Sequence, residues 1–382
     1  LKDQGLGRYV VPIVPDEART FGLEGLFRVA GIYSSQGQNY TPVDADTVVP
    51  YRESIDGQIL QEGICETGAI ASFMAAGTAY AVHGIPMIPF YIFYSIFGFQ
   101  RVGDMVWACG DMMCRGFLLG GTAGRTTLNG EGLQHQDGHS HVLASIYPDM
   151  KSYDPAFAFE LAVIVRDGIH RMYTLQEKCF YYITLYNENY RMPAMPEDAG
   201  VVEGILRGVY RWQRASMRGE QVHLLAGGSI MQQAIAAAAK LEALGYRVDI
   251  WSVTSFSELQ REAQRCERWN RLHPLLAPRR PFLETTFSKE QGVFVAVTDY
   301  MKALAGSIAP WMPRAYTVLG TDGYGLSETR EALRDYFEIS ADYIAHAALV
   351  ALCRETLISK AQFRRQVVKL NIDPEKMDPL DR

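Results

Sequence analysis

Residues 222–253 of the chain read VHLLAGGSIMQQAIAAAAKLEALGYRVDIWSV and decide the fold class. An apolar run, a Gly-Gly turn, an alanine-rich run and a second apolar run follow one another, which is the pattern of a βαβ unit. The expected elements are a strand at 222–226, a helix at 229–244 begun by Ser229 as N-cap and stopped by Gly245, and a strand at 247–253. Two parallel strands joined by a helix predict an α/β fold.

The same alternation extends over the rest of the chain. Further strands are predicted at 9–14, 87–93, 116–121, 179–185, 293–297 and 316–319. Helices are predicted after Glu66 and at 97–113, 154–166, 342–354 and 360–370, with Pro155 near the first turn of the helix at 154–166. Each half of the chain is therefore expected to form a mostly parallel sheet flanked by helices.

A proline-rich connection, Met192-Pro-Ala-Met-Pro-Glu-Asp198, interrupts this alternation, and the pattern restarts after it. The 382 residues are enough for two domains, because a domain usually takes about 100–200 residues. We therefore predict a first domain at 1–195 and a second domain at 196–382.

Composition limits the kinds of partner. The formal net charge is -6 and the charges are interspersed, so the sequence has neither a basic stripe for nucleic acid nor a polybasic segment for a membrane surface. Its six cysteines are scattered, which favours a reducing, cytoplasmic setting. No secretory signal pattern opens the sequence, and the start at Leu1 suggests a cut, processed or partial chain. Proteins and small molecules are the expected partners.

The stretch from Thr67 to Phe99 contains no Asp, Glu, Lys or Arg, which raises the question of a membrane span. Pro86, Pro89 and the glycines within the stretch argue against a span. A buried small-residue helix followed by a covered parallel strand produces the same uncharged run.

The densest group of reactive side chains lies in Asn129-Gly-Glu-Gly-Leu-Gln-His-Gln-Asp-Gly-His-Ser-His141. A glycine-rich loop carrying Glu131, His135, Asp137, His139 and His141 is a candidate site. The three histidines could bind zinc, although their spacing matches no standard zinc signature. Surface or structural histidines, and a metal-free acid/base or binding role, remain equally open on spacing alone.

Two acidic clusters are also candidates. Asp16 and Glu17 directly follow the first strand, where open α/β sheets place ligand crevices, but an acidic pair that opens a helix has the same pattern. Glu66 stands next to the uncharged stretch, where poor solvation would let its carboxyl group share a proton with a ligand. Taken alone, the same pattern is that of a glutamate at the start of a helix. The aromatic run at 90–99 offers stacking surfaces, although such residues are more often core.

Seven strings together carry a family resemblance that covers essentially the whole chain. They are Ile13-Val-Pro-Asp-Glu-Ala-Arg-Thr-Phe-Gly22, Gly57-Gln-Ile-Leu-Gln-Glu-Gly63, Phe97-Gly-Phe-Gln-Arg101, Gly124-Arg-Thr-Thr-Leu-Asn-Gly-Glu-Gly-Leu-Gln-His135, Asn187-Glu-Asn-Tyr190, Ser252-Val-Thr-Ser-Phe256 and Gly320-Thr-Asp-Gly323. In combination they resemble the homodimeric, bacterial-type pyruvate dehydrogenase decarboxylating component, which depends on thiamine diphosphate. The resemblance implies a pyrimidine-binding domain followed by a transketolase C-terminal-like domain.

The resemblance also implies roles for single residues. Glu66 matches the catalytic glutamate, whose carboxyl group hydrogen-bonds the aminopyrimidine of the cofactor and favours its reactive tautomer. Phe97 is implied to stack on the pyrimidine, while Tyr94, His135 and Glu17 are implied to face the substrate-derived adduct. Asp16 and Glu131 are implied to support them. In this context His135 is expected in the active site, and zinc binding by the loop loses support.

The family's magnesium-diphosphate signature, Gly-Asp-Gly followed by a later Asn, is missing from the sequence. The domain that binds diphosphate and Mg²⁺ is therefore expected outside this chain, either in the same longer polypeptide or in a separate subunit. The other implied partners are a second copy forming a dimer, the lipoyl-bearing acetyltransferase component and pyruvate or a larger 2-oxo acid. The isolated chain is expected to be inactive.

Three other functions remain as alternatives. The chain could belong to another thiamine-diphosphate enzyme of the transketolase superfamily, or it could be an assembly subunit that has lost cofactor binding. A zinc hydrolase that uses the histidine loop is a further possibility.

Overall fold

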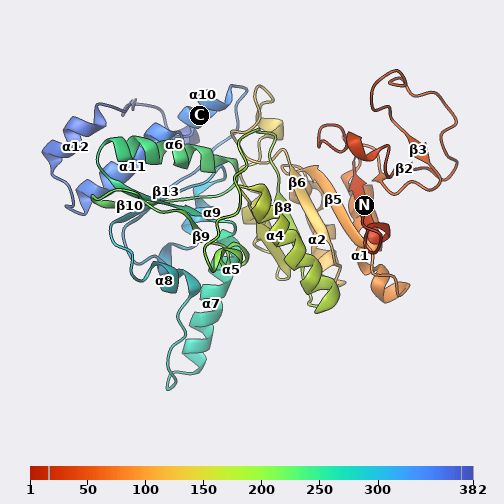
Figure 1. Cartoon of the computed structure of the whole chain (residues 1–382), viewed down its shortest axis with the longest axis horizontal. Coiled ribbons are helices and arrows are strands. Elements are labelled where there is room, and N and C mark those ends of the chain that lie inside the picture. Colours follow the sequence, from red (N-terminus) through yellow and green to blue (C-terminus); the bar gives the residue numbers. More distant parts are fainter. Residues whose placement is uncertain (16–17, 371, 382) are drawn as a thin grey trace. The chain divides into compact units, whose positions relative to one another are not determined.

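The structure is a computed structural model that describes residues 1–15, 18–370 and 372–381 (Figure 1). The chain forms two compact units, and each takes more than one segment of the sequence. Unit 1 comprises Leu1–Thr122, Leu143–Lys151 and Arg166–Leu185, and unit 2 comprises Ala123–Val142, Ser152–Val165 and Tyr186–Arg382. The domain boundary near residue 195 stays a prediction.

Unit 1 is built around a six-stranded sheet with the order β4-β1-β5-β6-β8-β7. The strands are β1 (Val10–Val14), β4 (Leu60–Gln61), β5 (Ile88–Tyr94), β6 (Phe117–Gly121), β7 (Met150–Tyr153) and β8 (Phe180–Thr184). The pairs β4/β1, β1/β5, β5/β6 and β6/β8 are parallel. A small parallel pair, β2 (Ile32–Tyr33) with β3 (Glu53–Ser54), forms a separate two-stranded sheet that contacts β4.

The helices α1 (Glu66–Val82) and α2 (Gly98–Asp111) contact each other, and α1 contacts β1 and β5. Buried Phe73, Phe93 and Phe99 belong to the core that these elements share with β6 and β8. Gly77 allows α1 its close approach, since a Cβ there would lie 2.8 Å from the carbonyl oxygen of Arg115. The uncharged stretch thus forms a helix with one buried face and a mostly buried strand, so the helix is less buried than predicted. None of the helices within the described ranges is long and apolar enough to cross a membrane.

Unit 2 contains a five-stranded sheet with the order β13-β12-β10-β11-β9. Its strands are β9 (Tyr210–Gln213), β10 (Gln221–Ala226), β11 (Arg247–Ser252), β12 (Val293–Val297) and β13 (Tyr316–Leu319). The strands are parallel except β9, which pairs with β11 in the antiparallel direction. The prediction of an α/β fold with mostly parallel sheets is therefore confirmed.

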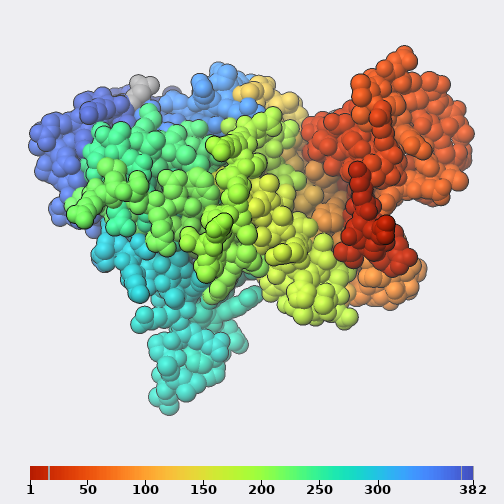
Figure 2. Space-filling view, viewed as in Figure 1, coloured from red at the N-terminus to blue at the C-terminus, as the bar shows by residue number. Residues whose placement is uncertain are grey.

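Helices cover both faces of the unit 2 sheet (Figure 1). One core joins the sheet to α6 (Met231–Ala243) and α11 (Ala341–Arg354), and the other joins it to α7 (Phe256–Leu272), α8 (Phe282–Phe287) and α9 (Lys302–Gly306). The remaining helices are α5 (Val201–Arg207), α10 (Arg330–Tyr336) and α12 (Lys360–Val367). The far end of α7 projects from the rest of the unit (Figure 2).

The βαβ unit at 222–253 is present as β10, α6 and β11, but its predicted N-cap is wrong. Ser229 lies inside a 3-10 turn, Gly228–Ile230, and Ile230 occupies the N-cap position of α6. Gly228 adopts a φ of +52° and starts this turn before α6 begins. Gly245 ends the helix as predicted, with a φ of +94° and an N–H donated to the carbonyl of Glu242.

The helix predicted at 154–166 also begins later than expected. It is α4 (Ala158–Ile169), so Pro155 precedes its first turn. The buried carboxylate of Glu160 accepts hydrogen bonds from the N–H groups of Ala156 at 2.6 Å and Phe157 at 3.1 Å. These bonds hold the segment before the helix in a non-helical conformation.

Candidate active site

Glu66 lies at the first position of α1, directly after an irregular segment. Cys65 is the N-cap, and its sulfur accepts a hydrogen bond from the N–H of Gly68 at 3.4 Å. The Glu66 side chain is only 12% exposed. A carboxylate at a helix N-terminus is favoured by the helix dipole, which helps this acidic side chain to sit at a largely apolar helix.

A guanidinium group accompanies the Glu66 carboxylate. Arg101 Nη1 donates to Glu66 Oε1 at 2.6 Å. The same guanidinium lies over the ring of Phe97, with its carbon 3.9 Å from the ring centroid. Tyr94, at the end of β5, contacts Phe97 edge-on at a centroid distance of 5.9 Å. Unit 1 therefore brings Glu66, Phe97 and Tyr94 together, with Arg101 between the carboxylate and the ring. The roles that the resemblance implies for these residues stay predictions.

Arg101 is a site residue to which the sequence analysis assigned no role. It lies in the string Phe97-Gly-Phe-Gln-Arg101, four positions after Phe97. Residues four apart on a helix share a face, so this spacing could have suggested the contact with Phe97. Its contact with Glu66 spans 35 residues and has no signal in local spacing.

Tyr91, on β5, adds a buried hydroxyl group near this carboxylate. Its side chain is fully buried, and its Oη atom has no hydrogen-bond partner within the part of the chain that the structure describes. Burial raises the pKa of Tyr91, and the negative charge of Glu66 raises that pKa further. A buried hydroxyl without a protein partner can donate a hydrogen bond to a ligand.

His135 lies in unit 2, at the end of the 3-10 turn Leu133–His135. Its Nδ1 atom is 3.1 Å from Glu131 Oε2, and the His135 side chain is 22% exposed. The candidate residues Glu131 and His135 therefore form a pair. The carboxylate lies where it can orient the imidazole ring.

His141 is buried among side chains that hold its ring in place. It is 3% exposed, its Nδ1 atom lies 2.6 Å from Ser152 Oγ, and its ring packs edge-on against Tyr300. Burial lowers the pKa of His141 to about 4. Asp137 accepts hydrogen bonds from the N–H groups of His139 at 3.0 Å and Ser140 at 2.9 Å. Hydrogen bonds therefore order this part of the loop.

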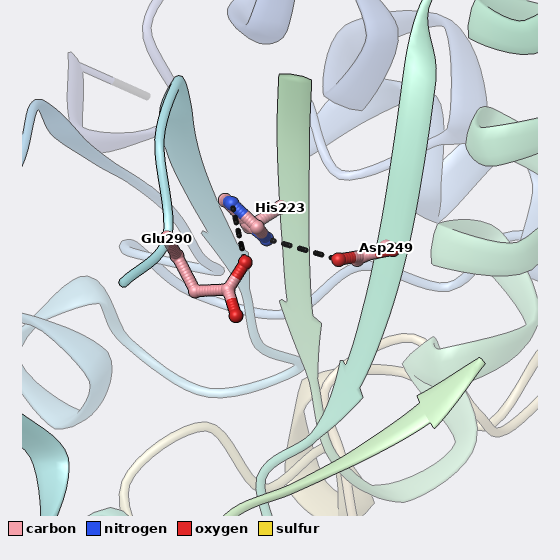
Figure 3. A group of neighbouring side chains, drawn as sticks. All are labelled: His223, Asp249 and Glu290. Atoms are coloured by element: carbon pink, nitrogen blue, oxygen red, sulfur yellow. Dashed lines mark ion pairs between the residues drawn. The ribbon is translucent and has the colours of Figure 1, made fainter. Parts of the chain in front are cut away.

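Among the described residues, the group with the geometry for a shared cation is His223, Asp249 and Glu290, rather than the histidine loop (Figure 3). Both imidazole nitrogens of His223 have partners, because Nδ1 accepts from Trp251 Nε1 at 3.1 Å and Nε2 lies 2.9 Å from the carbonyl oxygen of Gln291.

Arg211 forms ion pairs with both carboxylates of this group, Asp249 and Glu290. Its guanidinium supplies the positive charge that a cation would bring, and the hydrogen bonds of His223 hold its ring in place. The arrangement is therefore that of an ion network within the sheet, in which Arg211 balances the two carboxylates.

The candidates Asp16 and Glu17 lie outside the described residues. The described neighbours in their string include buried Val14 at the end of β1 and buried Ala18.

Comparisons with known proteins show the family of the chain. Residues 1–193 match the family described as pyruvate dehydrogenase E1 component middle domain, and residues 208–340 match the transketolase-like C-terminal domain. The pyruvate dehydrogenase E1 component of Pseudomonas aeruginosa is 52% identical over 100% of this chain and 43% of its own length. That of Escherichia coli K12 is 52% identical over 99% of this chain and 43% of its own length.

Solved structures support the fold alone. A transketolase from Campylobacter jejuni matches with a TM-score of 0.64 at 15% identity, over 90% of this chain and 44% of that protein. A transketolase from Leishmania mexicana matches with a TM-score of 0.64 at 14% identity, over 97% of this chain and 44% of that protein. The chain thus spans less than half the length of these relatives.

Proposed function

Because this chain belongs to the pyruvate dehydrogenase E1 component family, we propose that it is the pyrimidine-binding and C-terminal part of a thiamine-diphosphate-dependent 2-oxo acid dehydrogenase. The complete enzyme would decarboxylate pyruvate oxidatively and pass the acetyl unit to a lipoyl group. The observation that carries the proposal is the carboxylate of Glu66, 12% exposed and held at 2.6 Å by Arg101 beside the ring of Phe97.

These side chains fit the aminopyrimidine of the cofactor. A flat heteroaromatic ring needs an apolar face to stack on, which Phe97 supplies, and a group that can exchange a hydrogen bond with a ring nitrogen. A carboxyl group meets the second need. The hydroxyl of Tyr91, which has no hydrogen-bond partner among the described residues, supplies a further buried donor near Glu66.

Thiamine diphosphate, when bound, supplies the electron sink for breaking the bond between the carboxyl and keto carbons of the substrate. The part of Glu66 is to hold a proton or a hydrogen bond at its carboxyl oxygens, at the start of a rigid helix. Arg101 orients that carboxyl group through its guanidinium. Phe97 and Tyr94 exclude water from one side of the carboxylate.

In unit 2, we propose that His135 faces the substrate-derived group and moves a proton, with Glu131 orienting its imidazole at 3.1 Å. Tyr94 and Glu17 are proposed to face the same group, and Asp16 to support them. These roles follow from the family resemblance.

The relatives are more than twice as long as this chain, which leaves room for the part that binds diphosphate and Mg²⁺. We propose that this part, in the same polypeptide or in a separate subunit, completes the active site. A second copy of the chain and the lipoyl-bearing acetyltransferase component are the other proposed partners.

A reconstitution experiment tests the function. The chain is combined with the diphosphate-binding polypeptide, thiamine diphosphate and Mg²⁺, and reduction of ferricyanide is followed with pyruvate, with larger 2-oxo acids and with sugar phosphates. Turnover with pyruvate is expected. Turnover of sugar phosphates alone would favour a transketolase-like enzyme, and cofactor affinity unaffected by Glu66→Ala would favour an assembly subunit.

A further inference from the structure

The loop that carries His135 is held by a side-chain clamp within unit 2. The amide of Gln136 is paired with the backbone of Leu326 in both directions: Nε2 donates to the carbonyl of Leu326 at 2.7 Å, and the N–H of Leu326 donates to Oε1 at 2.8 Å. Gln136 is 1% exposed. The side chain thus bonds to the 326 backbone as a neighbouring strand would.

Glycine is required opposite this amide. A Cβ at Gly325 would lie 2.2 Å from Gln136 Oε1 and 3.0 Å from the Cα of Leu133. The first distance is far inside the range of a non-bonded contact, so any side chain at 325 would displace Gln136. The side-chain amide of Gln136 therefore packs directly against the backbone at residue 325.

Other bonds fix the preceding part of the loop to the same segment. The Oγ of Ser327 donates to the carbonyl of Gly130 at 2.7 Å, and the N–H of Arg330 donates to Asn129 Oδ1 at 2.9 Å. The loop is therefore attached on both sides of His135, at 129–130 and at Gln136.

His135 directly precedes the clamped residue and ends the 3-10 turn Leu133–His135. Its N–H lies 3.3 Å from the carbonyl oxygen of Gly132, which is a long hydrogen bond. The residue next to it, Gln136, is the one that is firmly bonded to another part of unit 2. The clamp thus fixes the chain directly after His135.

We propose that Gln136 is a positioning residue, which fixes His135 for the reaction through its pairing with Leu326. The inference rests on the role proposed for His135. It deepens that role by naming what places His135. The segment that contains Leu326, close after the string Gly320-Thr-Asp-Gly323, holds the residue next to His135. Displacement of a reacting group by about 1 Å can cost roughly 100-fold in rate.

The test in the reconstituted enzyme is the variant Gln136→Met, which keeps the length of the side chain and removes both hydrogen bonds. We expect kcat to fall by roughly 10- to 100-fold, with the KM for pyruvate and the affinity for thiamine diphosphate changed less than about threefold. Gly325→Ala should have the same effect, and the double variant should be no worse than either single one.

Epistasis separates positioning from a general structural role. In a His135→Ala background, Gln136→Met should lower kcat by less than about twofold, because the residue that it positions is already absent. An equal loss in both backgrounds would overturn the inference. Gln233→Met is the matched control, because Gln233 Oε1 accepts a hydrogen bond from the N–H of Ala341 at 3.1 Å, outside this loop. This variant should leave kcat unchanged.

Hydrogen exchange measured on the chain by itself tests the inference independently of turnover. If the wild-type assembly had no turnover, that result would count against the proposed function and not against this inference. Gln136→Met should speed amide exchange in the peptide at 130–137 by about tenfold or more, and Gln233→Met should not. Unchanged exchange in Gln136→Met would show that the amide does not hold the loop and would overturn the inference.

Discussion

The guanidinium of Arg101 lies 2.6 Å from the carboxylate of Glu66 and at the same time over the ring of Phe97. One cation thus connects an acid at the start of α1 with an aromatic ring at the start of α2. Hydrogen bonds between charged groups contribute about 1.5–3 kcal/mol, and a cation over an aromatic ring adds about 0.5–2 kcal/mol. The pair therefore fixes the direction of the carboxyl group before a ligand arrives.

The first prediction concerns this pair. Arg101→Met should lower kcat by about tenfold or more, because the carboxylate loses the charged hydrogen bond that orients it. Arg101→Lys keeps the charge but not the flat guanidinium, so its kcat should lie between those of the wild type and Arg101→Met. The measurement is pyruvate-dependent turnover of the reconstituted enzyme.

Arg115→Met is the matched control for this prediction. Arg115 also lies over an aromatic ring of unit 1, that of Tyr80 at 3.7 Å. A loss of turnover equal to that of Arg101→Met would mean that unit 1 is merely destabilised.

A second prediction concerns stacking. Phe97→Leu should weaken binding of thiamine diphosphate between about twofold and tenfold, because an aromatic contact contributes roughly 0.5–1.5 kcal/mol beyond its buried area. Titration of the reconstituted enzyme with the cofactor measures the effect. Phe90→Leu removes a ring that stacks on Phe117 at 4.6 Å, and equal affinities of the two variants would refute a stacking role for Phe97.

A third prediction follows from the close packing at the start of α2. A Cβ at Gly98 would lie 2.0 Å from Cε2 of Phe93. Gly98→Ala should therefore shift the helix start that carries Phe97 and Arg101, destabilise unit 1 by about 1–3 kcal/mol and weaken cofactor binding.

Gly110→Ala is the control on the same helix, since its Cβ would lie 3.7 Å from Phe180, an ordinary contact. Alanine is favoured over glycine in a helix by about 1 kcal/mol, so this variant should be neutral or slightly stabilising. Urea unfolding followed by a cofactor titration compares the two. Equal behaviour of both variants would rule out the packing constraint.

The fourth prediction is a pH dependence of stability. Burial lowers the pKa of His141 to about 4 from an ordinary value of 6.5. Between these pH values the unfolded chain binds a proton at His141 and the folded chain does not. The contribution of neutral His141 to the free energy of unfolding is therefore complete above pH 6.5 and is lost as the pH falls towards 4.

At pH 5 the free energy of unfolding is lower by about 2 kcal/mol than at neutral pH because of His141. His141→Asn should remove that part of the pH dependence, although it lowers stability at neutral pH. Unfolding in urea at pH 7 and pH 5 measures the difference, with exposed His83→Asn as the control. A pH dependence that His141→Asn leaves unchanged would disprove the assignment.

The local pattern of the sequence was sufficient to predict most of the strands and the α/β class. Apolar runs such as 222–226 and 293–297 form β10 and β12 because their side chains are buried on both faces of the sheet. Ser229 failed as an N-cap because a turn at Gly228 preceded the helix, and such a turn depends on tertiary packing rather than on the residue type.

Long-range contacts could not be predicted in this way. The bond between Glu66 and Arg101 joins residues 35 positions apart, and the clamp between Gln136 and Leu326 spans 190 positions. The family resemblance predicted roles for Glu66, Phe97 and Tyr94, and the structure shows that these residues lie close together in unit 1. It did not reveal what holds Glu66 or His135 in place, because those partners are ordinary arginine and glutamine side chains that only the fold brings near.

The most direct test of the account is the rate of carbon dioxide release from labelled pyruvate by the reconstituted enzyme carrying Glu66→Gln, with thiamine diphosphate shown to be bound. Glu62→Gln, a nearby carboxylate whose side chain bonds to Ser72, is the control. We expect Glu66→Gln to lower the rate by about 100-fold or more and Glu62→Gln to lower it less than about threefold. A Glu66→Gln enzyme that binds the cofactor and releases carbon dioxide at the wild-type rate would contradict the account.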